Sequence, residues 1–494
     1  MMIMKSSYTI IVPIFVFLLS LHLKETQCST RHSKLDEFQT KLQRLVTSNN
    51  LAKPAQTTPS PTSPKSNGRV FYPIGYGADP TGAQDSSAAI LAALNDAIKL
   101  KNGLNLLPGI SDLGGAVIDL QGGSFVISSP IRFPPDIGNI VVQGGSLRAS
   151  NTFPGDRHLI ELWAPDSQNA ALHRNFSDMK DLNNGMKYED VTLKDLLLDS
   201  TYRGGGLLVV DSARIRVSNC FFLHFTTQGI MVQRGHETFI SACFLGQHPT
   251  VGGDSDEKGY SATAIDIAST DNAVTDVVIF SAAIGISLRG RANIVTGVHC
   301  YNKATFFGGV GILVKSAQNR IVDSYLDFNS IVVEDPDQVV IANGFFLGDG
   351  NIVLKSIQGQ ISGLNIVNNI FSGEPKNNVP CVKLDGQFKS IDQVVIEHNV
   401  VSGMSLKSTA ANLNVQANGT KWEADFSPIL LFPNQITHLQ YSFYMRGGGI
   451  AAGFPAHAVT SVSNNVVVIE SQQPVNAVVS VSVDQHNMAG EGTL

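Results

Sequence analysis

One acidic residue stands among cations on the strand-like repeats of this chain. Short apolar phrases of alternating residues recur between positions 229 and 355, and the alternation puts Asp266, Arg289 and Lys315 on one outward face of successive copies. Arg291 follows in the turn after Arg289. Guanidinium and ammonium groups bind carboxylates. The face therefore predicts that Arg289, Arg291 and Lys315 bind an acidic polymer while Asp266 acts beside them as a catalytic carboxylate.

An acidic segment enters the strand that carries Asp266. The first copy of the phrase is separated from the second by 35 residues, against 19 to 26 for later copies, and the extra length contains Asp254, Asp256 and Glu257. Inverting glycosidases hold two carboxyl groups about 6.5–9.5 Å apart, whereas neighbouring coils lie about 4.8 Å apart. We therefore expect one of the three loop acids to act with Asp266. The alternative is a solvated Gly/Asp turn beside a structural Asp266.

The elements that must position these residues are the repeated phrases themselves. They are Gly229–Val232, Ala264–Ile267, Gly285–Leu288, Gly311–Val314, Ser330–Val333 and Asn351–Leu354. A period near 20 residues built from strand-length pieces indicates a solenoid. Asn272, Asn293 and Asn319 stand seven residues after the isoleucine of their copies, with Gln338 in the next. Asparagine tolerates left-handed turns, and stacked amides can hydrogen-bond. The pattern predicts an all-β, right-handed parallel β-helix. A sandwich of unrelated short strands would not explain the returning asparagine.

The rest of the chain divides by composition. Residues 1–28 are typical of a secretory signal, and 29–69 of a short helix followed by a Pro/Ser/Thr-rich linker. We place the β-helix at 70–425, with a helix near 88–100 covering its open end, and a cap of antiparallel strands at 426–494. Export would make Asn175 and Asn418, each in an Asn-X-Ser/Thr sequon, acceptors for glycosylation.

Composition and cysteine spacing limit the possible partners. The net charge is −6 without a basic block, which gives no reason to expect nucleic acid. We expect a monomer without a metal or other cofactor, and no membrane contact once the signal is removed. Cys220, Cys243 and Cys300 follow similar short contexts, so we expect them in one column of the solenoid. Either a Cys220–Cys243 disulfide or a stack of buried thiols is compatible with that column.

A motif near the start of the solenoid resembles a known family. The run Gly77-Ala-Asp-Pro-Thr-Gly-Ala-Gln-Asp-Ser-Ser-Ala-Ala-Ile90 looks like the opening motif of the pectin-degrading, pectin-lyase-like β-helix proteins. With the repeats, the signal and the sequons, the chain resembles the divergent plant polygalacturonases of the QUARTET type. That resemblance implies a secreted enzyme that hydrolyses demethylated pectin, an α-1,4-linked galacturonan, in the cell wall. It further implies breakdown of the pollen mother cell wall and separation of microspores.

The usual polygalacturonase motifs are missing. When Ala264–Ile267 is set against the first motif-bearing strand, the acidic positions fall on Thr263 and on Ala282-Ala283. A shifted frame leaves Gly348-Asp349 as half of the Gly-Asp-Asp motif, and makes Asp327 and Asp349 the next acids to consider. Two alternatives therefore remain. One is a pectate lyase with Ca²⁺ on the acidic loop and Arg289 as the base; the other is a pectin-binding wall protein without catalysis.

Overall fold

The computed structural model describes residues 63–101, 103–165, 185–247, 260–301, 309–446 and 453–486. The chain divides into two compact units, Met1–Thr62 and Ser63–Leu494, and the described residues belong to the second. The expected signal, most of the 29–69 segment, Asn175 and the loop acids Asp254, Asp256 and Glu257 lie outside the described residues. Over the described ranges no helix is long and apolar enough to cross a membrane.

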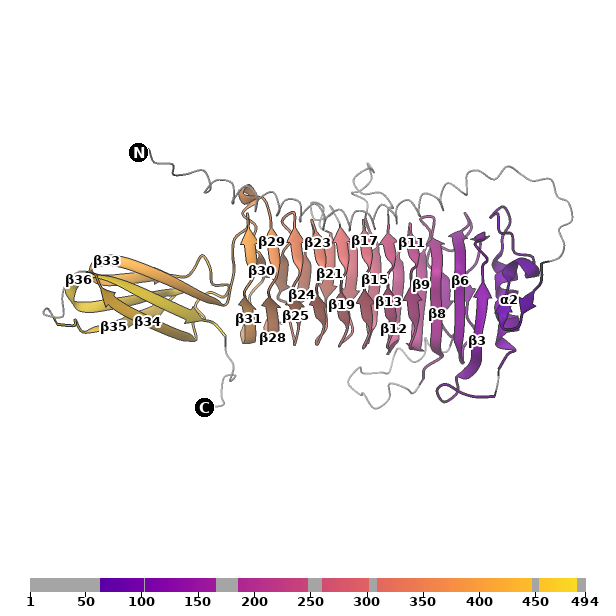
Figure 1. Cartoon of the computed structure of the whole chain (residues 1–494), viewed down its shortest axis with the longest axis horizontal. Helices are drawn as coiled ribbons and strands as arrows, with labels where there is room; N and C mark the ends of the chain where they lie inside the picture. Colours follow the sequence, from indigo (N-terminus) through magenta and orange to yellow (C-terminus); the bar gives the residue numbers. More distant parts are fainter. Residues whose placement is uncertain are drawn as a thin grey trace, which may run out of the picture. The chain divides into compact units, whose positions relative to one another are not determined.

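Parallel strands in three columns build a β-helix, and Figure 1 shows successive coils stacked in chain order. Column A contains β5 (Ile131–Arg132), β7 (His158–Leu162), β9 (Gly205–Ala213), β12 (Gln228–His236), β15 (Thr263–Thr270), β18 (Ile284–Leu288), β21 (Val310–Val314), β24 (Ile331–Glu334), β27 (Ile352–Lys355) and β30 (Val382–Asp385).

Columns B and C complete each coil. Column B contains β2 (Val70–Phe71), β3 (Ser111–Asp119), the first halves of β6 (Ile137–Ala149) and β8 (Tyr188–Asp199), β10 (Arg216–Ser218), β13 (Phe239–Ser241), β16 (Ala273–Thr275), β19 (Ile294–Thr296), β22 (Arg320–Val322), β25 (Val340–Ala342), β28 (Gln360–Val367) and β31 (Ser390–Glu397). Column C contains β4 (Ser124–Ile127), the second halves of β6 and β8, β11 (Phe221–Leu223), β14 (Phe244–Gly246), β17 (Val278–Phe280), β20 (His299–Tyr301), β23 (Tyr325–Asp327), β26 (Phe345–Leu347), β29 (Ile370–Ser372) and β32 (Val400–Ser402).

The repeated isoleucines form the core of column A. Their side chains are in register from coil to coil and fully buried, at Ile230, Ile265, Ile286, Ile312, Ile331 and Ile352. Because side chains alternate along a strand, the residue after each isoleucine faces outward. The parallel β-helix predicted from the repeat is confirmed.

The predicted asparagine ladder is present for three copies and then ends. Asn272 Nδ2 donates to Asn293 Oδ1 at 2.8 Å, and Asn293 Nδ2 donates to Asn319 Oδ1 at 3.1 Å. Placing Gln338 in the ladder was wrong, because Arg320 pairs with Val340 and so Val339 occupies the next ladder position. Gln338 instead accepts from Gln318 at the surface. The ladder position is seven residues after Ile312 but eight after Ile331, because the chain between each isoleucine and the next strand of its coil is one residue longer in the second case.

Two of the three similar cysteines share a column. Phe221 pairs with Phe244, so Cys220 and Cys243 are neighbours. Cys300 pairs with Ile279, which is two residues beyond Val277, the residue level with Cys243. Both Cys220 and Cys243 are buried free thiols, so the structure has the thiol stack rather than the disulfide. Burial, together with the neighbouring Cys243, raises the pKa of the Cys220 thiol well above its usual value. The shared context placed Cys300 wrongly because Val298, two residues earlier, occupies the position that corresponds to Cys243.

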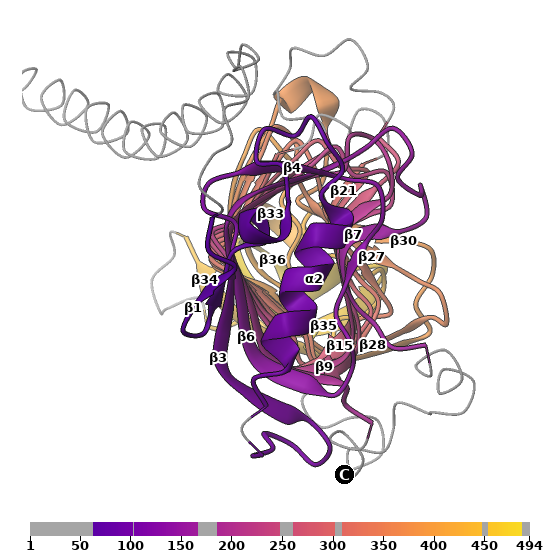
Figure 2. The same cartoon turned by 90° about the vertical axis from the view of Figure 1, so that its right-hand side faces the viewer.

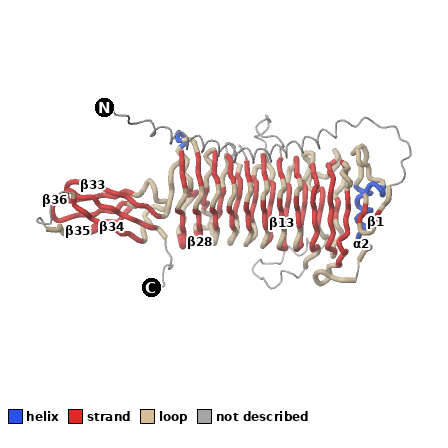
Figure 3. The backbone as a smooth tube through the Cα atoms, in the orientation of Figure 1, coloured by secondary structure: helices blue, strands red, loops and turns tan. Residues whose placement is uncertain are grey.

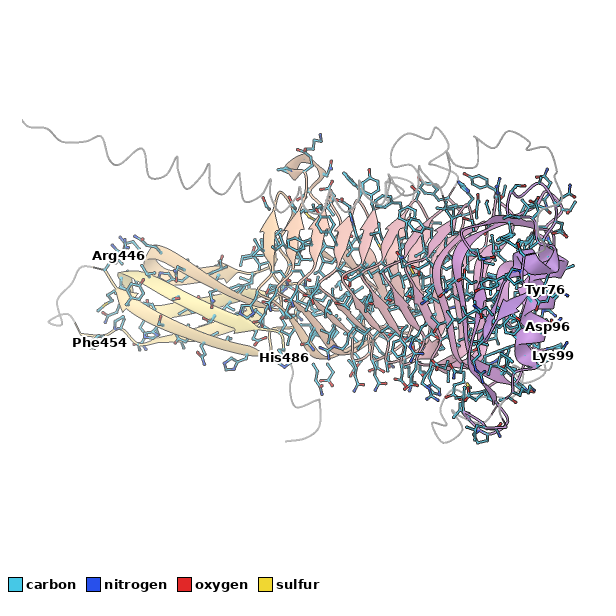
Figure 4. All side chains as sticks on the ribbon, turned by 45° about the vertical axis from the view of Figure 1, so that its right-hand side comes forward. Tyr76, Asp96, Lys99, Arg446, Phe454 and His486 are labelled. Carbon is cyan, nitrogen blue, oxygen red and sulfur yellow. The ribbon has the colours of Figure 1, made fainter. Side chains whose placement is uncertain are left out.

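Helix α2 (Ser87–Ile98) covers the N-terminal end of the coils, where Figure 2 shows it lying across the opening. Ile90 and Leu94 are buried against the first strands. The short segments β1 (Ser66–Asn67) and η1 (Pro73–Tyr76) precede the helix. Tyr76 donates its hydroxyl to Asp96 at 2.9 Å, and Figure 4 labels this pair beside Lys99. Burial and the Asp96 carboxylate raise the pKa of Tyr76 to about 12.

The C-terminal strands form a separate antiparallel sheet, drawn in red in Figure 3. It follows the short helix η4 (Pro375–Asn377) and the last coils, and contains β33 (Ala410–Asp425), β34 (His438–Met445), β35 (His457–Ser463) and β36 (Val466–Asp484). The first of these strands begins earlier than the expected start of the cap at 426. The sheet has its own core around the buried Trp422. Phe432 packs into the β-helix core instead, and Gln485 hydrogen-bonds to its backbone.

Candidate functional site

The structure brings Asp266 and Arg289 together on the outward face of column A. Arg289 Nε donates to Asp266 Oδ1 and Arg289 Nη2 donates to Asp266 Oδ2, both at 2.8 Å. The Asp266 side chain is 12% exposed. A bidentate guanidinium engages both carboxylate oxygens and fixes their position. This geometry suits a structural ion pair better than a group that exchanges protons with a substrate.

Lys315, another predicted cation on this face, is also balanced by an acid. Glu334 lies between Lys315 and Lys355, with Nζ–Oε distances of 3.5 Å and 3.2 Å respectively. Arg291 is exposed in the turn between β18 and β19. The expected cationic patch is thus largely neutralised. The prediction from the sequence did not include the effect of Glu334 on the next coil.

A second outward face, on column C, carries aromatic side chains that the sequence reasoning missed. We call it the aromatic face; its rings are Phe221, Phe244, Phe280, His299, Tyr301, Tyr325, Phe328 and Phe345. Neighbouring ring centroids lie 4.7–6.2 Å apart. The Phe221, Phe244 and Phe280 rings are buried, whereas Phe345 is 38% exposed. The accessible part of the face therefore runs from β20 to β26.

An acid and a histidine lie within this accessible part. His299 Nε2 is 3.7 Å from Asp327 Oδ2, and the two side chains are 32% and 20% exposed. The imidazole meets the Tyr325 ring edge-on at 4.7 Å and the Phe280 ring at 6.0 Å. Among the described residues His299 Nε2 has no hydrogen-bond partner, although the atom itself is buried. A carboxylate beside such an imidazole can hold and transfer a proton.

Asp349, the other acid indicated by the shifted motif frame, has a structural environment. Its Oδ1 accepts the Glu374 N–H at 2.7 Å, and its Oδ2 accepts from Asn377 Nδ2 at 2.5 Å. Both oxygens therefore hold the turn that leads into η4. Asp327 has no comparable set of backbone donors among the contacts of the described residues.

A further polar cluster lies at the start of column A. Glu161 is buried, and Arg132 and Arg157 donate to its two carboxylate oxygens. Both guanidinium groups lie over the Trp163 ring, at 4.3 Å and 5.9 Å from its centroid. Burial lowers the pKa of His158 to about 4. This cluster pairs its charges internally and has the character of a structural network.

The predicted partner acids and glycosylation sites are only partly described. Asp254, Asp256 and Glu257 belong to the segment that joins β14 to β15, outside the described residues. Asn418 is exposed on β33. One sequence signal could have indicated the aromatic face. Aromatic residues recur in the segment that follows the asparagine-turn strand of each copy, but the spacing between them varies.

Comparison with known proteins assigns the chain to a family. No protein-family model matches it. Polygalacturonase QRT3 of Arabidopsis thaliana is 47% identical over 493 residues, which cover 96% of this chain and 98% of that protein. The Dettilon tailspike protein shares the fold, with a TM-score of 0.51, 11% identity, and coverage of 84% of this chain and 94% of that one. The endo-xylogalacturonan hydrolase of Aspergillus tubingensis gives a TM-score of 0.48 at 11% identity, over 68% of this chain and 92% of its own. The chain belongs to the polygalacturonase family represented by QRT3.

Proposed function

We propose that this protein is a secreted hydrolase of demethylated pectin, cleaving α-1,4-linked galacturonan in the plant cell wall. The observation that carries the proposal is the 47% identity to Polygalacturonase QRT3 over nearly the full length of both chains. The setting that follows from this kinship is breakdown of the pollen mother cell wall and release of microspores.

The accessible part of the aromatic face is the proposed binding surface for the sugar chain. Sugar rings present apolar C–H faces that pack on aromatic rings, and sites for such ligands combine apolar walls with a few convergent polar groups. Tyr325 and Phe345 supply rings on adjacent coils, paired in register. A polymer lying along the stack of coils would meet them in succession.

Asp327 and His299 are the proposed proton-transfer groups. Hydrolysis of a glycosidic bond needs one group that protonates the leaving oxygen and one that activates water or attacks the sugar. Asp327 and His299 are 3.7 Å apart, closer than the two carboxyl groups of glycosidases, so the pair is proposed to supply one of these two roles, the transfer of a proton. Asp266 with one of Asp254, Asp256 and Glu257 is the competing assignment, and the bidentate contact of Asp266 with Arg289 weighs against it. That same contact weighs against Arg289 as the base of a lyase.

Product analysis with purified protein and polygalacturonate tests the function. The expected products are saturated oligogalacturonides with new reducing ends. Unsaturated products that absorb in the ultraviolet and disappear with a chelator would identify a lyase. Binding without new reducing ends would identify a wall-binding protein.

A further inference from the structure

A cluster of three polar and aromatic side chains lies on column C beside β8 and β11, on the N-terminal side of the accessible aromatic rings. Asp199 Oδ1 is 2.7 Å from His224 Nδ1 and also accepts the Thr201 N–H at 2.9 Å. The Tyr202 ring lies against the His224 imidazole, with centroids 4.7 Å apart. Because Asp199 engages Nδ1, the imidazole orientation is fixed and Nε2 is the nitrogen left to meet a ligand.

The backbone of this cluster is unusual for its residue types. Thr201 and Tyr202 are consecutive and left-handed, with φ of 48° and 56°, and His224 has φ of 53°. Glycine and asparagine take such positions at low cost, whereas a β-branched or bulky residue does not. The turn nevertheless presents Tyr202 with 46% of its surface exposed. The His224 conformation recurs at Ser281 and Phe328, the equivalent residues of other coils, so it belongs to the turn and not to this cluster.

A cation lies next to the exposed ring. Arg203 follows Tyr202 in the same turn and is exposed, and its Nη1 donates to the Phe153 carbonyl at 3.2 Å. The tether fixes the guanidinium through one of its five N–H groups, so others can meet a carboxylate. An aromatic ring, an imidazole and a guanidinium together match the chemistry of an acidic sugar.

Strand register fixes the separation between this cluster and the proposed active site. Asp199 and Asp327 occupy the same outward position, linked through Leu223, Gly246, Phe280 and Tyr301 on the strands between them. Five steps of about 4.8 Å put the two aspartates roughly 24 Å apart. The rings of Phe221, Phe244 and Phe280 between them are buried, so the two clusters are separate surfaces.

We propose that Tyr202, Arg203 and His224, with Asp199 orienting the imidazole, form an anchor site for the same acidic polysaccharide. The inference rests on the proposed function for the identity of the polymer. The sugar ring packs on Tyr202, and its carboxylate faces Arg203 and His224. Only a chain long enough to reach both sites gains from the anchor, which gives the enzyme a preference for long substrates.

The test compares long polygalacturonate with oligogalacturonides too short to span roughly 24 Å. Tyr202→Asn and His224→Asn remove the ligand-facing groups yet suit left-handed backbone, so they should retain Tm. KM on the long polymer should rise roughly three- to tenfold, as for loss of one aromatic contact. The kcat, and KM on the short oligomers, should stay at the wild-type values. Tyr444→Asn, at a 52% exposed tyrosine on β34, is the matched control and should change neither.

The remaining outcomes decide against the anchor. An equal rise in KM on long and short substrates overturns it, and so does an unchanged KM on both. A lowered Tm in both variants overturns it as well. Equilibrium binding of long polygalacturonate to the intact protein keeps the inference separate from the proposed hydrolysis. If the wild type binds without cleaving, the proposed function fails, while weaker binding by the two variants still supports the anchor. If the wild type does not bind, the anchor fails as well.

Discussion

The outward faces of columns A and C use the same coil geometry for different purposes. On column A, Asp266 is paired with Arg289, and Glu334 lies between Lys315 and Lys355. On column C, rings follow one another from coil to coil, with Asp327 and His299 among them. One face balances its charges internally; the other carries the pair that we propose for proton transfer.

The spacing of coils explains the contrast. Outward residues of adjacent coils are about 4.8 Å apart, so like charges at neighbouring positions repel and opposite charges attract. A column of charged side chains is therefore stable when positive and negative residues lie next to each other. Its net charge is then small, and it attracts a charged polymer only weakly. Aromatic rings can repeat without that penalty, because their contacts are favourable in edge-on and offset geometries.

The largest expected effect separates the two aspartates. Asp327→Asn should lower kcat on polygalacturonate by about 10²–10⁴, the range for loss of a general acid or base. Asp266→Asn should retain more than roughly a tenth of the wild-type activity per folded molecule. That loss is smaller than the range for a general acid or base. Initial rates measured on matched folded protein check both. The reverse order would return the chemistry to column A.

The second comparison concerns stability. Asp266→Asn leaves the Arg289 guanidinium without its carboxylate, and we expect a loss of about 1–3 kcal/mol in the free energy of unfolding. Asp327→Asn breaks no bidentate pair and should cost less. Urea unfolding of the two variants measures the difference. Equal losses would mean that the two carboxylates contribute equally to the free energy of unfolding.

The third comparison isolates the exposed rings. Phe345→Ala should weaken binding of polygalacturonate by about 0.5–1.5 kcal/mol, the contribution of one aromatic contact. Phe239→Ala provides the control, because Phe239 is 39% exposed on β13 of column B, against 38% for Phe345. Calorimetric titration of both variants should show a change only for Phe345→Ala. Equal weakening would remove the special role of column C.

The smallest expected effect is at Lys315. Its partner Glu334 already balances it, and an exposed ion pair contributes about 0–1 kcal/mol. Lys315→Met should therefore leave KM on polygalacturonate nearly unchanged at low and high salt. A severalfold rise in KM that shrinks in high salt would instead show that this lysine holds substrate carboxylates.

Local patterns in the sequence determined the β-helix and its asparagine ladder. Alternation decides which residues face inward, so the buried isoleucines from Ile230 to Ile352 could be identified without coordinates. Asn272, Asn293 and Asn319 could likewise be placed together, because each follows its isoleucine by the same number of residues. These features depend on spacing within one copy of the repeat.

Only the tertiary structure decided which outward groups meet. The Arg289–Asp266 contact, the Asp327–His299 approach and the mismatch at Gln338 all depend on register between coils. Turn lengths differ from coil to coil, so an error of one residue exchanges the inward and outward sets. The rings of the aromatic face occupy either outward position of the column C strands, as Phe244 and Phe280 do, so no single spacing marks it. The contacts between outward side chains of neighbouring coils decide which groups can act together, and these contacts form only when the chain folds into the β-helix.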